Sequence, residues 1–248
     1  MDWAEIRRAP GVAAGALIAP WIAAGSFVRR ARFFHPRGVV LWAKVTPVQR
    51  QGAWRELGDS LAGSALVRFS GAWWKSKQWL DVLGCAVRFT HATLPSVEPS
   101  PLDQDLLLAT VRIPGTTLLA PLTTHVEDYL RNAYFGVSPF TFGELGRIKL
   151  RLMPSRPSPD APSRAEALEE ALELGFTKLW LEARPARLGA KYERVAEIEL
   201  IEPALIDQEK LSFDPYRAGR GLEPAGFVHA MRIPVYAASR RGRASVAA

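Results

Sequence analysis

Histidine, tyrosine and arginine occur at two places where their spacing suits redox or acid–base chemistry. Arg32 and His35 flank two phenylalanines, and Arg232 lies four residues before Tyr236. Four residues is about one helical turn, so the last two side chains would share a helix face. A guanidinium there is expected to lower the pKa of the phenol and favour the phenolate, the form that ligates a metal. A neutral imidazole moves protons near neutral pH. The spacing alone does not distinguish an acid–base histidine and a tyrosine ligand from a structural histidine and an ordinary surface Arg–Tyr pair.

The familiar motifs of several other enzyme classes are absent from the sequence. It contains no GxSxG elbow, no phosphate-binding loop, no GxGxxG after a strand and no HExxH. Its four histidines are too dispersed for a recognisable zinc site. Cys85 is the only cysteine, which excludes an internal disulfide. It lies in an apolar run and is therefore predicted to be a buried small hydrophobe rather than a nucleophile.

The charge of the chain is basic but scattered. The formal net charge is +7, and the dense basic clusters are confined to residues 29–32 and 240–243. Zinc-finger spacing and the aromatic–basic signature of an RNA-binding sheet are missing, so we expect no nucleic-acid partner. The single cysteine gives no sign of an oxidising compartment. We expect a cytoplasmic protein, with membrane association left open.

Residues 11–28 form an uncharged apolar segment of about the minimum length for a membrane span. Pro20 and three glycines weaken that interpretation. Three interpretations stay open: a packed helix, an interfacial membrane contact, and a true span or signal peptide. We expect residues 1–28 to be an apolar helical segment, residues 29–243 the main domain, and residues 244–248 a tail.

The elements that must position these residues are mostly strands. Two helices are also predicted. One covers residues 122–134, where the apolar spacing is helical. The other covers residues 164–174, opened by a capping box of Ser163 and Glu166 and ended by Gly175. Period-two patterning predicts strands at 39–46, 64–70, 84–90, 146–153, 177–184 and 192–201, with a strand or short helix at 105–113, loops at 93–103 and 154–162, and an extended crossover at 202–225. Strands with non-local pairing and few helices predict an α+β fold built on an antiparallel barrel or curved sheet.

Three segments, in this order, resemble the catalase superfamily. RFFHPRG at 32–38, followed by WAKVT at 42–46, resembles the segment that carries the catalase distal histidine. VRFS at 67–70, followed by Asp81, Gly84 and AVRF at 86–89, resembles the next pair of catalase strands. FDP at 213–215, GLEP at 221–224 and RIPVY at 232–236 are similar to the stretch that ends in the haem-ligating tyrosine. Each piece alone is weak, but their order and separation make the resemblance specific over residues 29–90 and 192–243.

The resemblance implies a catalase-type antiparallel β-barrel with surrounding helices, a reduced N-terminal arm and no C-terminal extra domain. It also implies that residues 29–243 bind haem b, with Tyr236 as the axial ligand of the iron and Arg232 beside it. His35 would be the distal acid–base group, and Ser70 would hydrogen-bond its imidazole. Arg32 and Arg68 would pair with the haem propionates, a role that suits guanidinium forks.

The sequence departs from the catalase pattern on the distal side and beside the ligand. The place of the distal asparagine falls near Ala109, with Thr110 next to it, and the only asparagine, Asn132, has a different context. Disproportionation of hydrogen peroxide should therefore be poor. Pro234 lies between Arg232 and Tyr236, so the ligand helix is expected to begin close to it or to differ in geometry.

The leading hypothesis is a haem peroxidase that reduces hydrogen peroxide or organic hydroperoxides with a small reductant. A second hypothesis is a hydroperoxide isomerase or lyase that resembles allene oxide synthase. A third is a catalase-fold protein, with or without haem, that has no peroxide chemistry. Homo-oligomerisation and peripheral membrane contact through residues 11–28 are left open.

Overall fold

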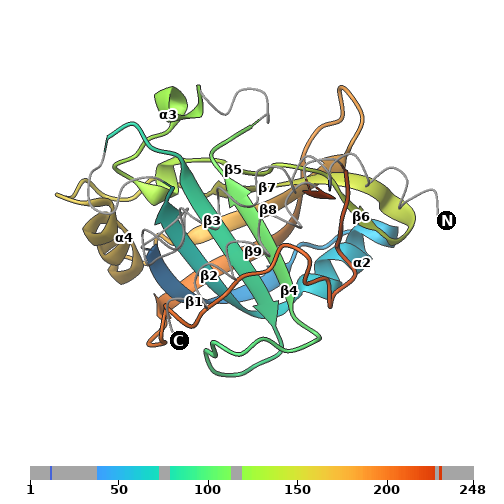
Figure 1. Ribbon diagram of the computed structural model, residues 1–248, viewed down its shortest axis with the longest axis horizontal. Helices are drawn as coiled ribbons and strands as arrows, with labels where there is room; N and C mark the ends of the chain where they lie inside the picture. The colour runs from blue at the N-terminus through green and yellow to red at the C-terminus, as the bar shows by residue number, and fades with distance from the viewer. Residues whose placement is uncertain (1–11, 13–37, 73–78, 113–118, 227–228, 231–248) are drawn as a thin grey trace.

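The structure is a computed structural model that describes residues 12, 38–72, 79–112, 119–226 and 229–230 (Figure 1). The predictions for His35, Arg32, Arg232 and Tyr236, and for nearly all of residues 11–28, lie outside the described residues. Most of the strand and helix predictions lie within them.

In the described part of the chain, ten strands form one antiparallel sheet, and the pairing of β7 with β8 closes eight of them into a barrel (Figure 1). Around the barrel the order is β7-β5-β4-β3-β2-β1-β9-β8, while β6 and β10 extend the sheet beside β7. The strands are β1 Gly38–Pro47, β2 Gly63–Gly71, β3 Leu83–Thr90, β4 Gln104–Ala109, β5 Tyr134–Gly136, β6 Phe140–Phe142, β7 Gly146–Pro154, β8 Lys178–Pro185, β9 Glu193–Pro203 and β10 Glu223–Pro224. The predicted antiparallel barrel is confirmed.

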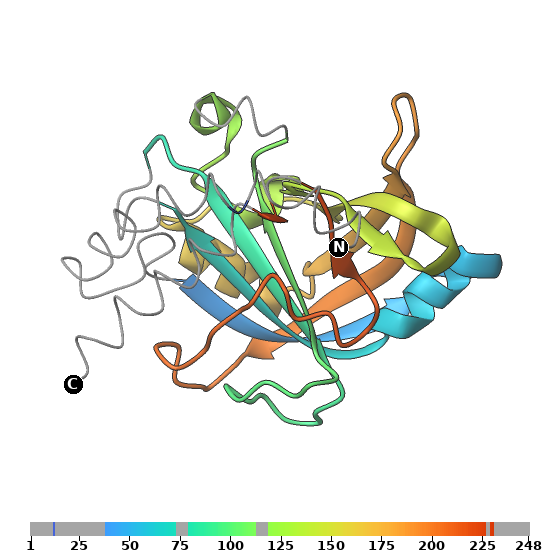
Figure 2. The same cartoon turned by 45° about the vertical axis from the view of Figure 1, so that its right-hand side comes forward.

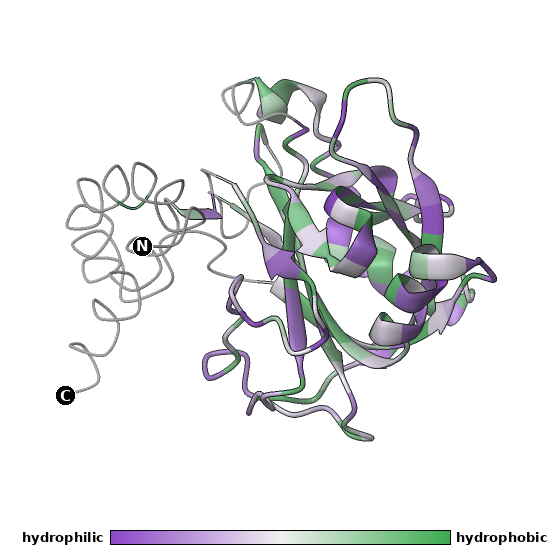
Figure 3. Cartoon of the chain, turned by 90° about the vertical axis from the view of Figure 1, so that its right-hand side faces the viewer, coloured by the Kyte–Doolittle hydropathy of each residue, from purple (hydrophilic) through white to green (hydrophobic). Residues whose placement is uncertain are grey.

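Apolar side chains fill the interior of the barrel. On β1, Leu41, Ala43 and Val45 point inward and are almost completely buried, as period-two alternation requires. Figure 3, coloured by hydropathy, shows hydrophobic and hydrophilic residues alternating along several strands. Alternate residues of a closed barrel face the core, which is why the patterning predicted most strands to within a residue or two.

The helices among the described residues are short: α2 Gly52–Leu61, α3 Ala120–Thr123, α4 Arg164–Glu173, and the 3-10 turns η2 Tyr129–Arg131 and η3 Gly143–Leu145. Helix α4 confirms the prediction of a helix over residues 164–174. Ser163 Oγ accepts a hydrogen bond from the Glu166 N–H at 3.3 Å, and Gly175 has a φ of +69° just after the helix. Helix α2 was not predicted, because Gln51 at its start makes no side-chain cap and Gly52 opens it.

The prediction of one helix over residues 122–134 is wrong. The segment contains the end of α3, then η2, then the start of β5. The Asn132 side chain explains the break, because its amide donates to the backbone oxygens of His125 and Asp128 at 2.7 and 2.6 Å. Its Oδ1 also accepts from the His125 N–H at 2.9 Å. These bonds fold the chain into a tight loop in place of a continuous helix.

Within the described residues, no helix combines the length and the apolar content needed to cross a lipid bilayer.

Candidate functional site

The outer face of β2 carries two of the predicted site residues. Val67 and Phe69 point into the barrel core, so Arg68 and Ser70, which alternate with them, face outward. Both outward side chains are nevertheless buried, Arg68 with 5% and Ser70 with 3% of its surface exposed. The structure therefore places these two polar groups together on a covered part of the barrel wall.

Ser70 belongs to a row of small residues that crosses four neighbouring strands. Strand register aligns Gly38 of β1 with Ser70, Ser70 with Gly84 of β3, and Gly84 with Ala109 of β4. We call these four residues the small-residue row. Within the row, Ser70 and Ala109 are two strands apart, or roughly 10 Å. Because no side chain in the row is larger than serine, this part of the wall presents backbone and small groups to whatever lies against it.

The Arg68 guanidinium lies beside the row. Its Cζ would be 3.0 Å from a Cβ added to Gly38, and that Cβ would also collide with the Phe69 carbonyl oxygen. Glycine is therefore required at position 38 for the arginine to lie across the strand end. The next row along the face aligns Val40, Arg68, Ala86 and Leu107, so the residues paired with Arg68 across the sheet are small or apolar.

The structure places Ala109 in the row and gives Thr110 a separate structural role. The Thr110 hydroxyl accepts from the Leu83 N–H at 3.2 Å and shares a 2.8 Å hydrogen bond with Thr124 Oγ1. Thr110 thus fastens β4 to β3 and to the loop after α3. The Asn132 side chain forms its hydrogen bonds within its own loop. Neither residue is placed to replace a distal amide at Ala109.

An apolar cluster continues the outer face beyond the small-residue row. It consists of Ala72, Val82, Val111 and Ala120, with Ala109 packed against it. The covered wall therefore runs from a cationic side chain, across a strip of small residues, to an apolar patch. This arrangement of a cation, small residues and an apolar patch suits a flat, amphiphilic group with anionic substituents at one edge.

Sequence reasoning missed a buried ion cluster farther along the same face. Arg88 Nε lies 3.0 Å from Asp105 Oδ1, and Arg217 pairs with Asp105 Oδ2. The Asp214 N–H also donates to Asp105 Oδ2 at 2.8 Å. Burial raises the pKa of Asp105, while the two guanidinium groups oppose that shift. The cluster fastens the crossover at 204–222 to β3 and β4. The only signal in the sequence was the presence of charged residues in strands that otherwise read as buried.

Gln104 fastens the same crossover at a second point. Its Nε2 donates to the carbonyl oxygens of Arg217 and Leu222 at 2.8 and 3.1 Å, and its Oε1 accepts from the Leu222 N–H at 3.2 Å. Strand β10 follows directly and pairs with β6. The chain is therefore anchored at Leu222 before it continues towards Arg232 and Tyr236.

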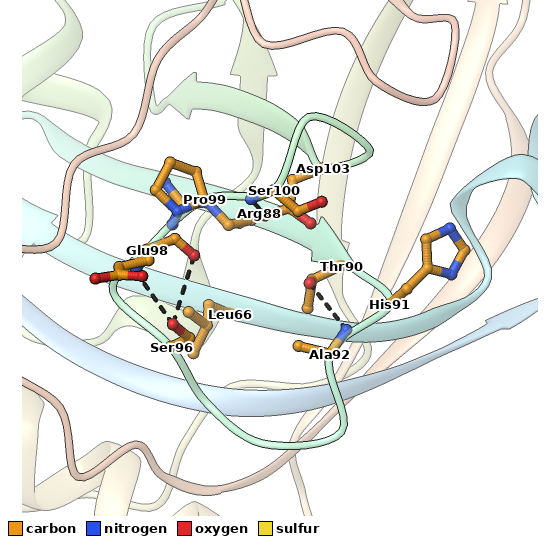
Figure 4. Close-up of a pocket in the computed structure, with 10 residues that line it drawn as sticks. All are labelled: Leu66, Arg88, Thr90, His91, Ala92, Ser96, Glu98, Pro99, Ser100 and Asp103. Carbon is orange, nitrogen blue, oxygen red and sulfur yellow. Dashed lines mark hydrogen bonds between the residues drawn. The ribbon is translucent and has the colours of Figure 1, made fainter.

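A separate cavity of about 390 Å³ lies under the loop that joins β3 to β4 (Figure 4). Thr90 and Asp103 line it at the ends of those strands, and Ser100 hydrogen-bonds Asp103 Oδ2 at 2.9 Å through its N–H. Thr90 is six residues along β3 from Gly84, a span of about 20 Å. The cavity contains none of the predicted site residues and is distinct from the small-residue row.

The remaining predicted residues are accounted for as follows. Cys85 is buried in the barrel core, and burial raises the pKa of its thiol well above the usual value, so the prediction of a buried small hydrophobe is confirmed. His35, Arg32, Arg232 and Tyr236 lie outside the described residues and stay predictions. Within the described part of the chain, no group of three or more histidine, cysteine or acidic side chains is gathered as a metal site.

The fold is similar to that of a fungal catalase of known crystal structure. The two chains match with a TM-score of 0.58 and 12% sequence identity, over 86% of this chain and 58% of the catalase chain. No protein-family model matches the sequence, and no curated protein matches it. The protein therefore has a catalase-like fold and spans little more than half the length of that catalase chain.

The residues of the wall fit haem b on two structural grounds. No side chain of the small-residue row is larger than serine, so none would project against a flat ring. Arg68 places a buried guanidinium beside that row, where a carboxylate substituent would be paired. The row, Arg68 and the apolar cluster are the described groups that would contact the ring.

Proposed function

We propose that this protein is a haem-dependent peroxidase that reduces hydrogen peroxide or organic hydroperoxides. The observation that carries the proposal is the small-residue row beside buried Arg68, on a barrel of catalase-like fold. His35 precedes Gly38 of this row by three residues, so chain length alone keeps the two Cα atoms within about 11 Å. This chain length is compatible with a position of His35 near the row, which supports its assignment.

His35 is assigned the proton transfers. Its neutral imidazole takes a proton from the near oxygen of a hydroperoxide and returns it to the far oxygen. Ser70 holds the imidazole in one tautomer by a hydrogen bond. Bound haem b would supply the redox chemistry of the reduction.

The other assigned residues hold the cofactor. Arg32 and Arg68 would pair with its carboxylates, and guanidinium forks suit this role. Tyr236 would ligate the iron as phenolate, and the neighbouring Arg232 would favour that charged form.

Ala109 directs the proposal towards peroxidase and away from catalase activity. It takes the position in the row where a distal amide would assist a second peroxide molecule, and a methyl group forms no hydrogen bond. A small external reductant then completes the cycle in place of that second peroxide.

A second candidate is a hydroperoxide isomerase or lyase that needs no reductant. The observation that favours it is the apolar cluster of Ala72, Val82, Val111 and Ala120 beside the row, because this surface suits the acyl chain of a lipid hydroperoxide. Reductant dependence separates the two candidates. A third candidate, a catalase-fold protein without peroxide chemistry, is supported by the absence of a distal amide.

The test is hydroperoxide turnover by the haem-supplemented protein with and without a phenolic reductant. We expect turnover that depends on the reductant. The turnover rate should fall by about 100-fold or more in His35→Ala, because this variant lacks the acid–base group. His91→Ala is the matched control, because His91 is exposed in the β3–β4 loop. Equal rates in His35→Ala and the parent would remove His35 from the mechanism, and product rearrangement without reductant would favour the isomerase.

A further inference from the structure

The hairpin that joins β8 to β9 projects from the barrel. It spans residues 186–192 and stands out at the upper right of Figure 2, drawn in tan. Leu188 near its tip is fully exposed, the most exposed of the large hydrophobic side chains in the described part of the chain. A single exposed leucine says little by itself. Its significance depends on the charged residues around it.

Five cations lie on the hairpin and on the strands below it. Arg187 and Lys191 flank Leu188 on the hairpin, Arg184 lies on β8, and Arg147 and Lys149 lie on β7. None of these five takes part in the salt bridges among the described residues. The basic charge that looks scattered in the sequence is gathered here by the pairing of β7 with β8.

Two of these cations oppose each other directly. Lys149 and Arg184 are partners in the register of β7 and β8. Like charges directly opposite on one face destabilise a sheet. An anionic surface outside the protein would relieve that repulsion.

The neighbouring acidic side chains are already engaged with other arginines. Glu182 pairs with Arg151 at 2.6 Å and with Arg194 at 3.9 Å. Glu193 pairs with Arg50 at 3.2 Å. The uncompensated charge at the hairpin is therefore positive.

The aromatic rings nearby are covered, which argues against single-stranded nucleic acid as the partner. The Arg151 and Arg184 guanidinium groups lie 4.2 and 5.1 Å from the centroid of Tyr192, and Arg194 lies 4.1 Å from that of Trp180. Bases stack on open aromatic faces, whereas these faces are occupied. An exposed leucine flanked by cations is instead the pattern of a peripheral contact with anionic lipid.

We propose that the β8–β9 hairpin docks the protein on an anionic lipid membrane. Leu188 enters the boundary between head groups and acyl chains, and Arg187 and Lys191 contact lipid phosphates. Arg147, Lys149 and Arg184 add attraction over a longer range. If the proposed peroxidase function holds, docking also identifies the substrate class as hydroperoxides of membrane lipids. This part of the inference rests on the proposed function, whereas the docking itself does not.

Vesicle co-sedimentation of the full chain tests the docking without any peroxide chemistry. We expect binding to phosphatidylcholine vesicles that contain about 30% phosphatidylserine, weak binding to pure phosphatidylcholine, and a loss of binding as salt is raised. The double variant Arg187→Gln/Lys191→Gln should bind about tenfold or more weakly. Leu188→Ser should also bind more weakly, because it loses the apolar insertion.

Matched controls lie elsewhere on the surface. Leu205 is 98% exposed in the crossover, so Leu205→Ser removes an equivalent leucine, and Lys210→Gln removes an exposed cation. Both controls should bind as the parent does. Thermal unfolding of all variants checks that the exposed substitutions leave the fold intact.

Three outcomes would overturn the proposal: equal binding to both vesicle types, equal losses in Leu188→Ser and Leu205→Ser, or tighter binding to a single-stranded RNA oligonucleotide that Leu188→Ser leaves unchanged. Because binding is measured without peroxide, a failed peroxidase assay leaves the docking result standing, and a failed docking assay leaves the peroxidase proposal intact for soluble hydroperoxides.

Discussion

Arg88 of β3 and Asp105 of β4 lie directly opposite each other on the outer wall of the barrel and form a two-point ion pair that is almost completely buried. Arg88 Nε is 3.0 Å from Asp105 Oδ1, and a second nitrogen is 3.4 Å from Oδ2. Arg217 completes the cluster from the crossover. The pair therefore joins the barrel to the segment that leads to the predicted tyrosine ligand.

Asp105→Asn tests this linkage. The change leaves two guanidinium groups buried without a counter-charge, so we expect the free energy of unfolding to fall by about 3–5 kcal/mol. Urea denaturation measures it. Asp207→Asn is the control, since Asp207 is exposed in the crossover. A loss below about 1 kcal/mol in Asp105→Asn would show that the cluster does not hold the crossover in place.

Ala109→Asn tests the interpretation of the small-residue row. An amide at this position is expected to raise reductant-free disproportionation of hydrogen peroxide by about tenfold, because it supplies a hydrogen bond that alanine lacks. Oxygen evolution by the haem-supplemented protein measures the gain. Ala109→Leu, which adds bulk without an amide, should give no increase. An equal response to both changes would exclude the row from the distal site.

Cys85 should be unreactive while the protein is folded. The thiol is buried in the barrel core, and burial raises its pKa, so the thiolate that reacts with reagents is scarce. A chromogenic disulfide at about pH 8 should label the folded protein at least about 100-fold more slowly than the protein unfolded in urea. Rapid labelling of the folded state would contradict the packing of β3.

Tyr134 should make the fold sensitive to alkali. Its hydroxyl donates to the Tyr129 carbonyl oxygen at 2.8 Å, and burial raises the pKa of Tyr134 well above its usual value. A raised pKa in the folded state means that its contribution to stability is complete below the unfolded pKa of about 10. That contribution is lost as the pH rises above this value towards the folded pKa.

Urea denaturation between about pH 7 and pH 11 measures this effect. Tyr134→Phe should lower the free energy of unfolding by about 1 kcal/mol at neutral pH, because one hydrogen bond is lost. The variant should also lose less stability than the parent over the alkaline range. Parallel pH profiles for parent and variant would show that Tyr134 ionises as freely in the folded state as in the unfolded state.

The sequence predicted the barrel well because each strand carries its own evidence. Residues such as Val67 and Phe69 alternate with polar neighbours on a single strand, and Ser163 with Glu166 is a local capping signal. Helix α2 has no such cap at Gln51. The loop at 125–132 depends on side-chain bonds of Asn132, so helical spacing was misleading there.

The candidate site was harder to predict because its relationships run between strands. Ser70 and Arg68 were identified by resemblance, and the structure places both on the covered wall. Their alignment with Ala109 depends on the register of three strand pairs, which no local pattern encodes. The basic surface at the β8–β9 hairpin arises in the same way, since Lys149 and Arg184 become neighbours only when the barrel closes.

Haem titration of the purified protein tests the central claim most directly. We expect saturable binding with a Soret band typical of ferric haem ligated by a phenolate. Tyr236→Phe should lose that band or shift it, while Tyr192→Phe, a control at the end of the β8–β9 hairpin, should behave as the parent. A protein that stays colourless after haem supplementation, or a Tyr236→Phe variant with an unchanged spectrum, would contradict the account.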